Sequence, residues 1–537
     1  MSAAASVVLG VGPLAARDVV DVARRDARIS ISEEALRAMA GSRAVIDALA
    51  GDEVPHYGVS TGFGALATKQ IPLDLRAQLQ RSLIRSHAAS SGQPVEREVV
   101  RGLMVNRLAT MTTGRTGVRP VVAQTYAALL NAGITPVVGE YGSLGCSGDL
   151  APLSHCALAL MGEGEVFDAA GVRRPAAEVL AEAGIEPVRL AEKEGLALIN
   201  GTDGMLGMLL MAAEDLERLY TTADVAAALT IEALLGTDSV FAEDLHELRP
   251  QPGQIDSAAN LRELLAGSPL ISGAPDVRAP GNAERFLGHD REKKSGEHRF
   301  TRVQDAYSLR CAPQVHGAGR ATLAHARQVA EFELSSAVDN PVVTPDGRVE
   351  SNGNFHGAPV GYVLDFLAIA AADCASISER RTDRMLDKNR SHGLNPFLAD
   401  DPGVDSGHMI AQYTQAGIVS EMKRLAVPAS ADSIPSSAMQ EDHVSMGWSA
   451  GLKLRRAVDG LQRVLAVEIL TAARALDMRD GGGAASKSSP ALAGVRAKVR
   501  ERVEGPGTDR YLAPEMESVV ELVRAGELVS AAGIPLR

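Results

Sequence analysis

The stretch Glu140–Met161, EYGSLGCSGDLAPLSHCALALM, joins the densest glycine cluster of the chain to an apolar run with helical spacing. Closely spaced glycines predict a specially shaped loop. Asp149 is a candidate N-cap of the helix that follows, and Pro152 stands in its first turn. A nucleophile elbow does not fit, because Gly145-Cys146-Ser147-Gly148 departs from the order G-x-S-x-G. A reactive thiol at a helix N-terminus and a plain glycine turn both remain open.

Beyond this stretch, the chain is dominated by long segments with few Gly or Pro and with apolar residues at helical spacing. They predict a mostly α fold in which a long-helix bundle follows an N-terminal mixed region. We expect the mixed region at residues 1–199 and the bundle with a C-terminal helical region at 200–537. The five segments are Met205–Leu235, Gly317–Val338, Gly361–Leu386, Met409–Leu425 and Ser449–Met478.

The N-terminal part also contains helical patterns, broken by loops. Arg17–Ala50 has helical spacing, with Ser32-Glu33-Glu34 as a plausible first turn, and the start of the chain resembles a strand or core-covering segment. Tyr57–Gln70, YGVSTGFGALATKQ, has no helical period and is expected to be a shaped or mobile loop. A nucleotide-binding loop is disfavoured there, since the G-x-G-x-x-G fingerprint is absent.

Composition excludes several classes of function. The 537 residues have a net charge of -13 and a pI near 5.5, which disfavours nucleic-acid binding. One basic run, Arg291–Arg302, is interpreted as a solvated loop or as a rim that attracts an anionic substrate. Four scattered cysteines fit a reducing cytoplasm, and the twelve histidines form no metal-binding motif. The chain contains no uninterrupted apolar run of about 18 residues, so the sequence predicts no membrane span.

Polar loops between the helices contain the candidate chemistry. Tyr57 and Tyr307 stand beside such loops, and a tyrosine needs positive charge nearby to act as a base near neutral pH. Arg310 follows Tyr307 by three residues and is either a clamp for a substrate carboxylate or part of a structural ion pair. The run Gln440-Glu441-Asp442-His443 is either a buried polar network or a catalytic set.

Six motifs together resemble the aromatic amino acid ammonia-lyase family, in the order in which that family has them. The resemblance covers roughly Tyr57 to Met446, with similar helical texture beyond it. The motifs are YGVSTGFG (57–64), GSLGCSGDLAPLSH (142–155), INGT (199–202), QDAYSLRCAPQVHG (304–317), DNP (339–341) and SIPSSAMQEDHVSM (433–446).

This resemblance implies a protein-derived electrophile. In the family an Ala-Ser-Gly tripeptide forms 4-methylidene-imidazol-5-one (MIO) autocatalytically, without an external cofactor. Here the tripeptide is Cys146-Ser147-Gly148, so its first residue departs from the family pattern. The departure is compatible with the chemistry, because the ring uses the carbonyl of Cys146 and the amide nitrogen of Gly148, while Ser147 supplies the methylidene carbon.

Residue roles follow from the same resemblance. Tyr57 is the expected base for the β-proton, and Asn200 is expected to bind the ring or the substrate carboxylate. Arg310 is expected to hold that carboxylate, with Gln304 and Tyr307 lining the site. Phe355 is expected to contact the substrate ring.

Selectivity is expected to depend on His87 and Glu441. Family members that act on histidine are similar to this chain at both places, and a carboxylate accepts a hydrogen bond from an imidazole N–H that a phenyl ring lacks. The resemblance thus implies elimination of ammonia from L-histidine to give trans-urocanate, the first step of histidine degradation. Alternatives are action on tyrosine or phenylalanine, as a lyase or 2,3-aminomutase, and an inactive helical scaffold.

The resemblance also implies an assembly. We expect a cytoplasmic homotetramer in which each active site contains residues from several subunits. The expected partner is a small-molecule substrate, with no nucleic acid, membrane or metal.

Overall fold

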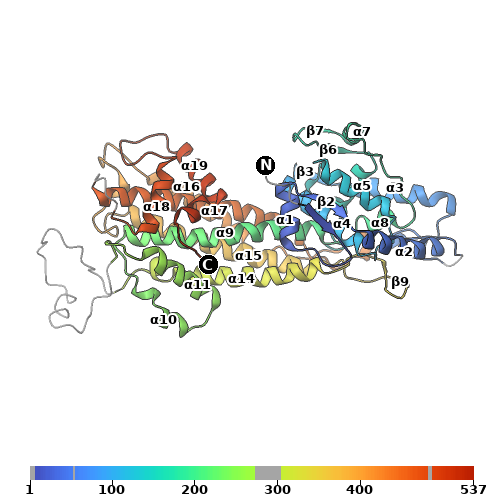
Figure 1. Ribbon diagram of the computed structural model, residues 1–537, viewed down its shortest axis with the longest axis horizontal. Coiled ribbons are helices and arrows are strands. Elements are labelled where there is room, and N and C mark those ends of the chain that lie inside the picture. The colour runs from blue at the N-terminus through green and yellow to red at the C-terminus, as the bar shows by residue number, and fades with distance from the viewer. Residues whose placement is uncertain (1–5, 53–54, 272–303, 482–486) are drawn as a thin grey trace, which may run out of the picture. The chain divides into compact units, whose positions relative to one another are not determined.

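The computed structural model describes residues 6–52, 55–271, 304–481 and 487–537, and most of them are helical (Figure 1). The mostly α fold expected from the sequence is confirmed. The basic run Arg291–Arg302 lies outside the described residues.

The chain forms two compact units that interleave along the sequence. Unit 1 comprises Met1–Ala213, His325–Phe366 and Pro428–Arg455, and unit 2 comprises Glu214–Ala324, Leu367–Val427 and Arg456–Arg537. This partition differs from the expected division between residues 199 and 200. The difference arises because the unit boundaries fall inside four long helices: α9 (Asp203–Ala233), α14 (Ala312–Leu334), α15 (Ala358–Leu386) and α17 (Gly447–Asp480).

Unit 1 contains short strands between helices of moderate length. Its strands are β1 (Ser6–Leu9), β2 (Arg28–Ile31), β3 (Ser91–Pro94), β4 (Thr135–Pro136), β5 (Gly139–Tyr141), β6 (Glu165–Phe167), β7 (Arg173–Pro175), β8 (Val342–Val343) and β9 (Val349–Glu350). Its helices are α1 (Ala16–Arg25), α2 (Glu33–Ala50), α3 (Arg76–His87), α4 (Arg97–Thr112), α5 (Pro120–Asn131), α6 (Leu150–Leu160), α7 (Ala176–Glu182) and α8 (Glu194–Ala197), with the 3-10 turns η1 (Gly64–Leu66), η2 (Leu73–Leu75) and η5 (Ser437–Met439).

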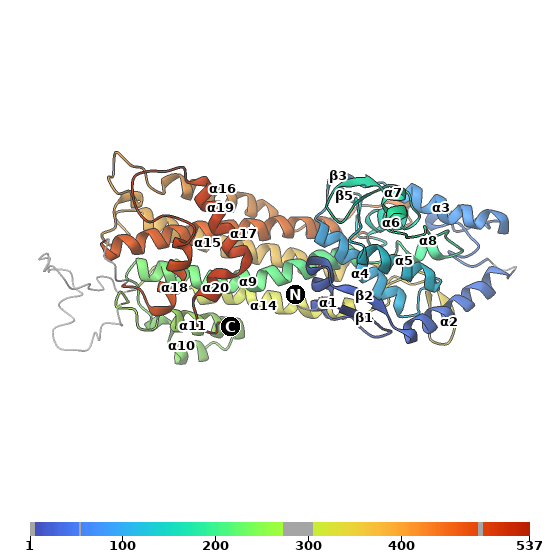
Figure 2. The ribbon, with the colours of Figure 1, turned by 45° about the horizontal axis from the view of Figure 1, so that its top comes forward.

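The strands of unit 1 form small separate sheets. β1 pairs in parallel with β2, while the pairs β3–β5 and β8–β9 and the three-stranded β4–β6–β7 sheet are antiparallel. Around them, α1, α2 and α5 contact α4, and α3 contacts α6 and α8 (Figures 1 and 2). Nearly every residue of α4 is buried, so this helix is the centre of the unit.

The expected continuous helix over Arg17–Ala50 is wrong in one respect, because β2 interrupts it. Asp26 ends α1 in the left-handed conformation, and Arg28–Ile31 then has the alternating exposure of a strand. The expected helix start at Ser32 is confirmed, since its hydroxyl accepts a hydrogen bond from the amide of Ala35 at 3.1 Å.

Unit 2 is built almost entirely from helices. Segments of α9, α14, α15 and α17 lie side by side in it in both views (Figures 1 and 2). The expected segment Met409–Leu425 is a helix with the predicted bounds, α16. The remaining elements are η3 (Ser239–Phe241), α10 (Glu243–Glu247), α11 (Pro252–Leu265), α13 (Tyr307–Arg310), η4 (Pro396–Leu398), α18 (Pro490–Arg500), α19 (Ala513–Ala525) and α20 (Glu527–Ala531).

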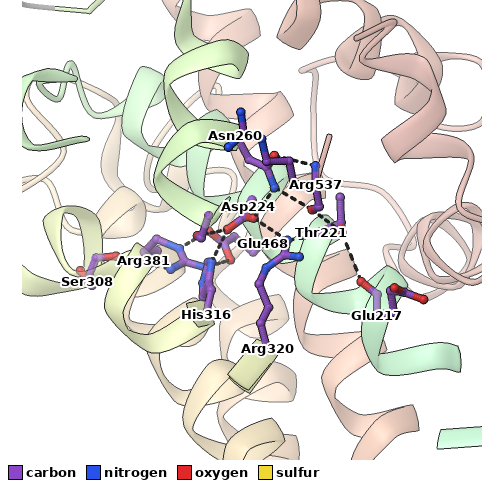
Figure 3. A network of polar contacts seen from close by, with 11 residues as sticks. Glu217, Thr221, Asp224, Asn260, Ser308, His316, Arg320, Arg381, Glu468 and Arg537 are labelled. Carbon is purple, nitrogen blue, oxygen red and sulfur yellow. Dashed lines mark hydrogen bonds and ion pairs between the residues drawn. The ribbon is translucent and has the colours of Figure 1, made fainter. Parts of the chain in front are cut away.

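Buried charges join the long helices of unit 2 (Figure 3). Glu468 on α17 accepts hydrogen bonds from both Arg381 and Ser378 of α15 and from Thr230 of α9, at 2.5–2.9 Å. Asp224 on α9 contacts His316 and Arg320 of α14 at 2.7 and 2.8 Å. Paired in this way, these charges fix how the helices meet.

In the part of the chain that the structure describes, one helix, α15, is long and apolar enough to cross a membrane by length and composition alone. Most of its apolar window is buried among the described residues. In unit 1, its buried Asp365 pairs with Lys453 and accepts a hydrogen bond from the amide of Ser430, both at 2.7 Å. These features are typical of a core helix.

Candidate functional site

The tripeptide Cys146-Ser147-Gly148 lies between β5 and α6, where the loop meets the start of α9. Gly148 pairs with Gly201 as an isolated parallel bridge, and the amide of Asp149 donates to the carbonyl of Gly201 at 2.7 Å. Gly148 has φ +76°, and a Cβ there would lie 2.0 Å from the Gly201 carbonyl oxygen. Only glycine fits this position.

Asp149 fixes this junction in a way that differs from the predicted cap. Although it stands before α6, its side chain forms no cap bond with that helix. Its carboxylate instead accepts from the amides of Gly204 and Met205 in the first turn of α9, at 2.8 and 2.9 Å, and from the Ser143 hydroxyl at 2.9 Å. Burial raises the pKa of Asp149 to about 7. The tripeptide thus lies near the N-terminal ends of α6 and α9, whose dipoles favour negative charge.

The residues before the tripeptide are held by segments distant in sequence. The carbonyl of Gly145 accepts hydrogen bonds from the Ser445 hydroxyl at 2.8 Å and from the Gly357 amide at 3.1 Å. The amide of Met446 donates to the carbonyl of Leu144 at 2.9 Å. The backbone is therefore held before the tripeptide, at Leu144 and Gly145, and after it, at Asp149.

Glu441 contacts the first two residues of the tripeptide. Its Oε1 accepts from the Ser147 hydroxyl at 2.9 Å, and its Oε2 accepts from the Cys146 thiol at 3.1 Å. Burial raises the pKa of Glu441, but hydrogen bonds from Cys146, Ser147 and serines of its own loop outweigh burial and lower it. Burial and the same carboxylate raise the pKa of Cys146 to about 12. Cys146 is therefore a neutral thiol, which rules against the reactive-thiolate interpretation.

Tyr57 lies in a loop that closes on itself. Thr61 bridges Gln70, and the amide of Ile71 donates to the carbonyl of Ser60 at 2.9 Å. The Tyr57 hydroxyl accepts from the amide of Gly64 at 3.4 Å. Burial raises the pKa of Tyr57 and the Gly64 bond lowers it, while the charge of Glu441 raises it further. A shaped loop is confirmed, and its mobility stays a prediction.

Asn200 is buried beside the Gly201–Gly148 bridge. Its side-chain amide donates to the carbonyl of Leu196 at 3.2 Å, and its backbone carbonyl accepts from the buried Arg107 at 2.5 Å. Arg107 also binds the carbonyls of Ala197 and Val338. One guanidinium therefore holds the turn that presents Asn200.

Phe355 and His87 lie in unit 1 in different settings. Phe355 is half-buried in the loop that ends at Gly357, and the next residue, His356, stacks on His443 with ring centres 5.7 Å apart. This loop therefore contacts both the tripeptide loop and the Glu441 segment. His87 ends α3, and its Nδ1 lies 2.9 Å from the carbonyl of Leu83 on the same helix.

Gln304, Tyr307 and Arg310 belong to unit 2. Tyr307 and Arg310 form the short helix α13, as their spacing suggested, with the guanidinium 4.6 Å from the centre of the Tyr307 ring. The Tyr307 side chain is 71% exposed, so it is available to a ligand. Arg381, paired with Glu468, donates to the carbonyl of Ser308 within α13 at 3.4 Å (Figure 3).

The tripeptide fits the ring that the resemblance implies. A left-handed glycine supplies the ring nitrogen, a serine supplies the exocyclic carbon, and two helix N-termini lie beside it. Among the described residues, no group of three or more His, Cys, Asp or Glu is arranged to hold a metal ion.

Several residues of this site were missed from the sequence. Four residues shape the loops, although no motif marks them as chemical groups: Gly201, Arg107, Ser436 and Ser445. The motifs around 199–202 and 433–446 included three of them, but only the distances reveal their contacts.

Comparison with known proteins identifies the family. The model of the aromatic amino acid lyase family matches residues 14–501, and the chain belongs to this family. A histidine ammonia-lyase of Streptomyces avermitilis is 64% identical over 527 residues, covering 98% of each chain.

Solved structures give the same result. A tyrosine aminomutase from Streptomyces globisporus has a TM-score of 0.92 at 38% identity, covering 99% of this chain and 100% of that one. A histidine ammonia-lyase from Trypanosoma cruzi has a TM-score of 0.86 at 36% identity, covering 99% of this chain and 96% of that one.

Proposed function

We propose that the chain is a histidine ammonia-lyase, a carbon–nitrogen lyase that converts L-histidine to trans-urocanate and ammonia. The observation that carries this proposal is the Glu441 carboxylate, which contacts the side chain of Ser147 and stays ionised at neutral pH. An anionic acceptor at the tripeptide matches an imidazole N–H, whereas the phenyl ring of phenylalanine offers no donor; tyrosine can donate its phenol O–H, so the preference over tyrosine rests on the relatives. The relatives named histidine ammonia-lyase support the same assignment.

The proposed cofactor is MIO, formed from Cys146-Ser147-Gly148. It supplies an electrophilic alkene that makes the amino group of the substrate a leaving group. Proximity of two helix N-termini favours negative charge at the tripeptide.

Residues of the chain itself remove the proton and bind the substrate. Tyr57 takes the β-proton of the substrate, and Arg310 binds the carboxylate through its planar fork. Asn200 binds the ring carbonyl or the substrate carboxylate.

Other residues select and enclose the substrate. Glu441 accepts from the imidazole N–H, and His87 pairs with the same ring. Phe355 packs against it, while Gln304 and Tyr307 line the site.

We further propose that the protein acts as a cytoplasmic homotetramer with active sites shared between subunits, and without nucleic acid or membrane partners. Four free cysteines support a reducing compartment. Light scattering coupled to gel filtration tests the assembly: a tetramer is expected, and a stable, active monomer would contradict it.

The deciding experiment follows near-ultraviolet absorbance with L-histidine, L-tyrosine and L-phenylalanine as parallel substrates. Urocanate from histidine is expected, and its formation should disappear in Ser147→Ala. Glu441→Gln should lower kcat/KM for histidine roughly 10- to 100-fold, since a hydrogen bond to a charged group is lost. Unchanged histidine turnover in Glu441→Gln would refute the selectivity argument.

A second candidate, action on tyrosine as a lyase or 2,3-aminomutase, is favoured by the structural similarity to the tyrosine aminomutase. A coumarate or β-tyrosine product, with no urocanate from histidine, would select it. Inactivity on all three substrates, with no absorbance from the tripeptide, would favour a scaffold.

A further inference from the structure

The loop that ends at Glu441 is closed by its own backbone. Ser436 and Glu441 pair with each other, their amides donating to each other's carbonyl at 2.8 and 3.3 Å. Between them, Ser437, Ala438 and Met439 all have left-handed φ angles of 50°, 53° and 69°. Three consecutive non-glycine residues in this conformation are costly, and such strain persists only where the surroundings impose it. The backbone of Glu441 is therefore held in a fixed place.

The two oxygens of the Glu441 carboxylate have different donors. Oε2 accepts from the hydroxyl of Ser436 at 2.9 Å and from the thiol of Cys146 at 3.1 Å. Oε1 accepts from the hydroxyl of Ser147 at 2.9 Å, and the hydroxyl of Ser437 is a further donor to the carboxylate, which helps to lower its pKa. Two donors from different segments bind Oε2, and together they fix the rotation of the carboxylate. Oε1 then faces Ser147 of the tripeptide.

Formation of the ring removes only one of these donors. A bond forms between the amide nitrogen of Gly148 and the carbonyl carbon of Cys146. The carbonyl oxygen leaves as water with the amide hydrogens of Ser147 and Gly148. Ser147 then loses its hydroxyl and its α-hydrogen as a second water, which creates the double bond. Oε1 thereby loses the Ser147 hydroxyl, whereas the Ser436 hydroxyl and the Cys146 thiol stay outside the ring.

We propose that Ser436 and Cys146 are positioning residues that hold Oε2 of Glu441, so that ring formation leaves Oε1 alone to accept the imidazole N–H of the substrate. This inference rests on the proposed function. It assigns a purpose to the cysteine that departs from the Ala-Ser-Gly pattern of the family, since alanine has no donor for the carboxylate.

The test uses the full-length protein and compares Ser436→Ala, Cys146→Ala and the double variant with Ser436→Thr and Cys146→Ser, which keep a donor. Each protein is measured for intact mass, near-ultraviolet absorbance, and KM and kcat for L-histidine. Each Ala variant should raise KM roughly fivefold, as expected for one hydrogen bond, and the double variant more than either. The loss of two waters relative to each variant's calculated mass and the absorbance should match wild type, kcat should change less than KM, and the donor-keeping variants should stay near wild type.

The matched control is Cys156→Ala, which removes a buried thiol of α6 next to Tyr126 and should leave KM unchanged. A wild-type KM in the double variant would overturn the proposal, as would Thr and Ser variants as impaired as the Ala variants. Loss of the two-water mass change in the double variant would also overturn it, because the donors would then act in ring formation. Failure of the proposed function is seen separately, as wild-type protein without the mass change or without urocanate.

Discussion

Two glutamates, the half-buried Glu441 in unit 1 and the buried Glu468 in unit 2, have several hydrogen-bond donors each, but the donors differ in kind. Those of Glu468 are an arginine, a serine and a threonine on rigid helices, and they use both of its oxygens permanently. Those of Glu441 lie on loops, and one of them, Ser147, is consumed in the proposed chemistry. A carboxylate stabilises the fold where its donors are permanent, and it is available to a ligand where one donor is lost.

The largest effect is expected at the glycine of the tripeptide. Gly148→Ala should abolish activity and near-ultraviolet absorbance, because its Cβ would lie 2.0 Å from the Gly201 carbonyl oxygen. The matched control is Gly171→Ala, with nearly the same φ, +77°, and open space around the Cβ. It should cost only about 1–2 kcal/mol of stability and no activity. Activity in Gly148→Ala would show that the Gly148–Gly201 pairing is dispensable.

Removal of the proposed base comes next. Tyr57→Phe should lower kcat about 100- to 10,000-fold with a small change in KM, as expected when a general base is removed. The basic form of Tyr57 becomes more abundant as pH rises, and because its pKa is raised above the ordinary value of about 10, wild-type kcat/KM should increase from about pH 7 and still be rising at about pH 10.

A pH profile of initial rates measures this increase. Glu441→Gln removes a charge that raises the pKa of Tyr57, so any residual activity should rise at lower pH than in wild type. A profile in Tyr57→Phe with the same rise as wild type would identify a different base.

In unit 2 the expected loss is stability. Arg381→Met leaves Glu468 buried without its guanidinium and should lower the free energy of unfolding by about 3–5 kcal/mol, measured by urea denaturation. The control is Arg348→Met, which removes exposed ion pairs and should leave the melting temperature unchanged. Equal stability of the two variants would contradict the structural role of Glu468.

The smallest effect concerns the strained loop before Glu441. Ala438→Gly should raise stability by about 0.5–1 kcal/mol, since glycine adopts a left-handed φ without a steric cost. The same substitution at exposed Ala40 in α2 should lower stability by about 1 kcal/mol. Changes in melting temperature of opposite sign in the two variants would confirm the strain at Ala438, and changes of the same sign would refute it.

Much of the fold was predictable from the sequence because periodic apolar residues mark helices directly. α16 has its predicted bounds, and α9, α15 and α17 lie close to theirs. β2 was missed because four residues with strand-like alternation are short beside the helical patterns around them. Interleaving of the units was also not predictable, since helical spacing does not reveal where a long helix passes from one compact unit to another.

The site was predicted as a set of motifs, and its contacts required the structure. Sequence order gave Cys146, Ser147 and Glu441 as candidates, but nothing in it indicated that the thiol and the hydroxyl bind different oxygens of one carboxylate. Asp149 was expected to cap α6, yet it caps α9, because loop geometry decides which helix start its carboxylate reaches.

The hydrogen bond between Ser445 and the carbonyl of Gly145 joins residues that are 300 positions apart. A nascent polypeptide on the ribosome acquires this bond only after Ser445, and so most of the chain, has been synthesised. In the proposed chemistry, the backbone around the tripeptide is therefore completed late in translation. A chain that ends before Ser445 would therefore present the tripeptide without this constraint on its backbone.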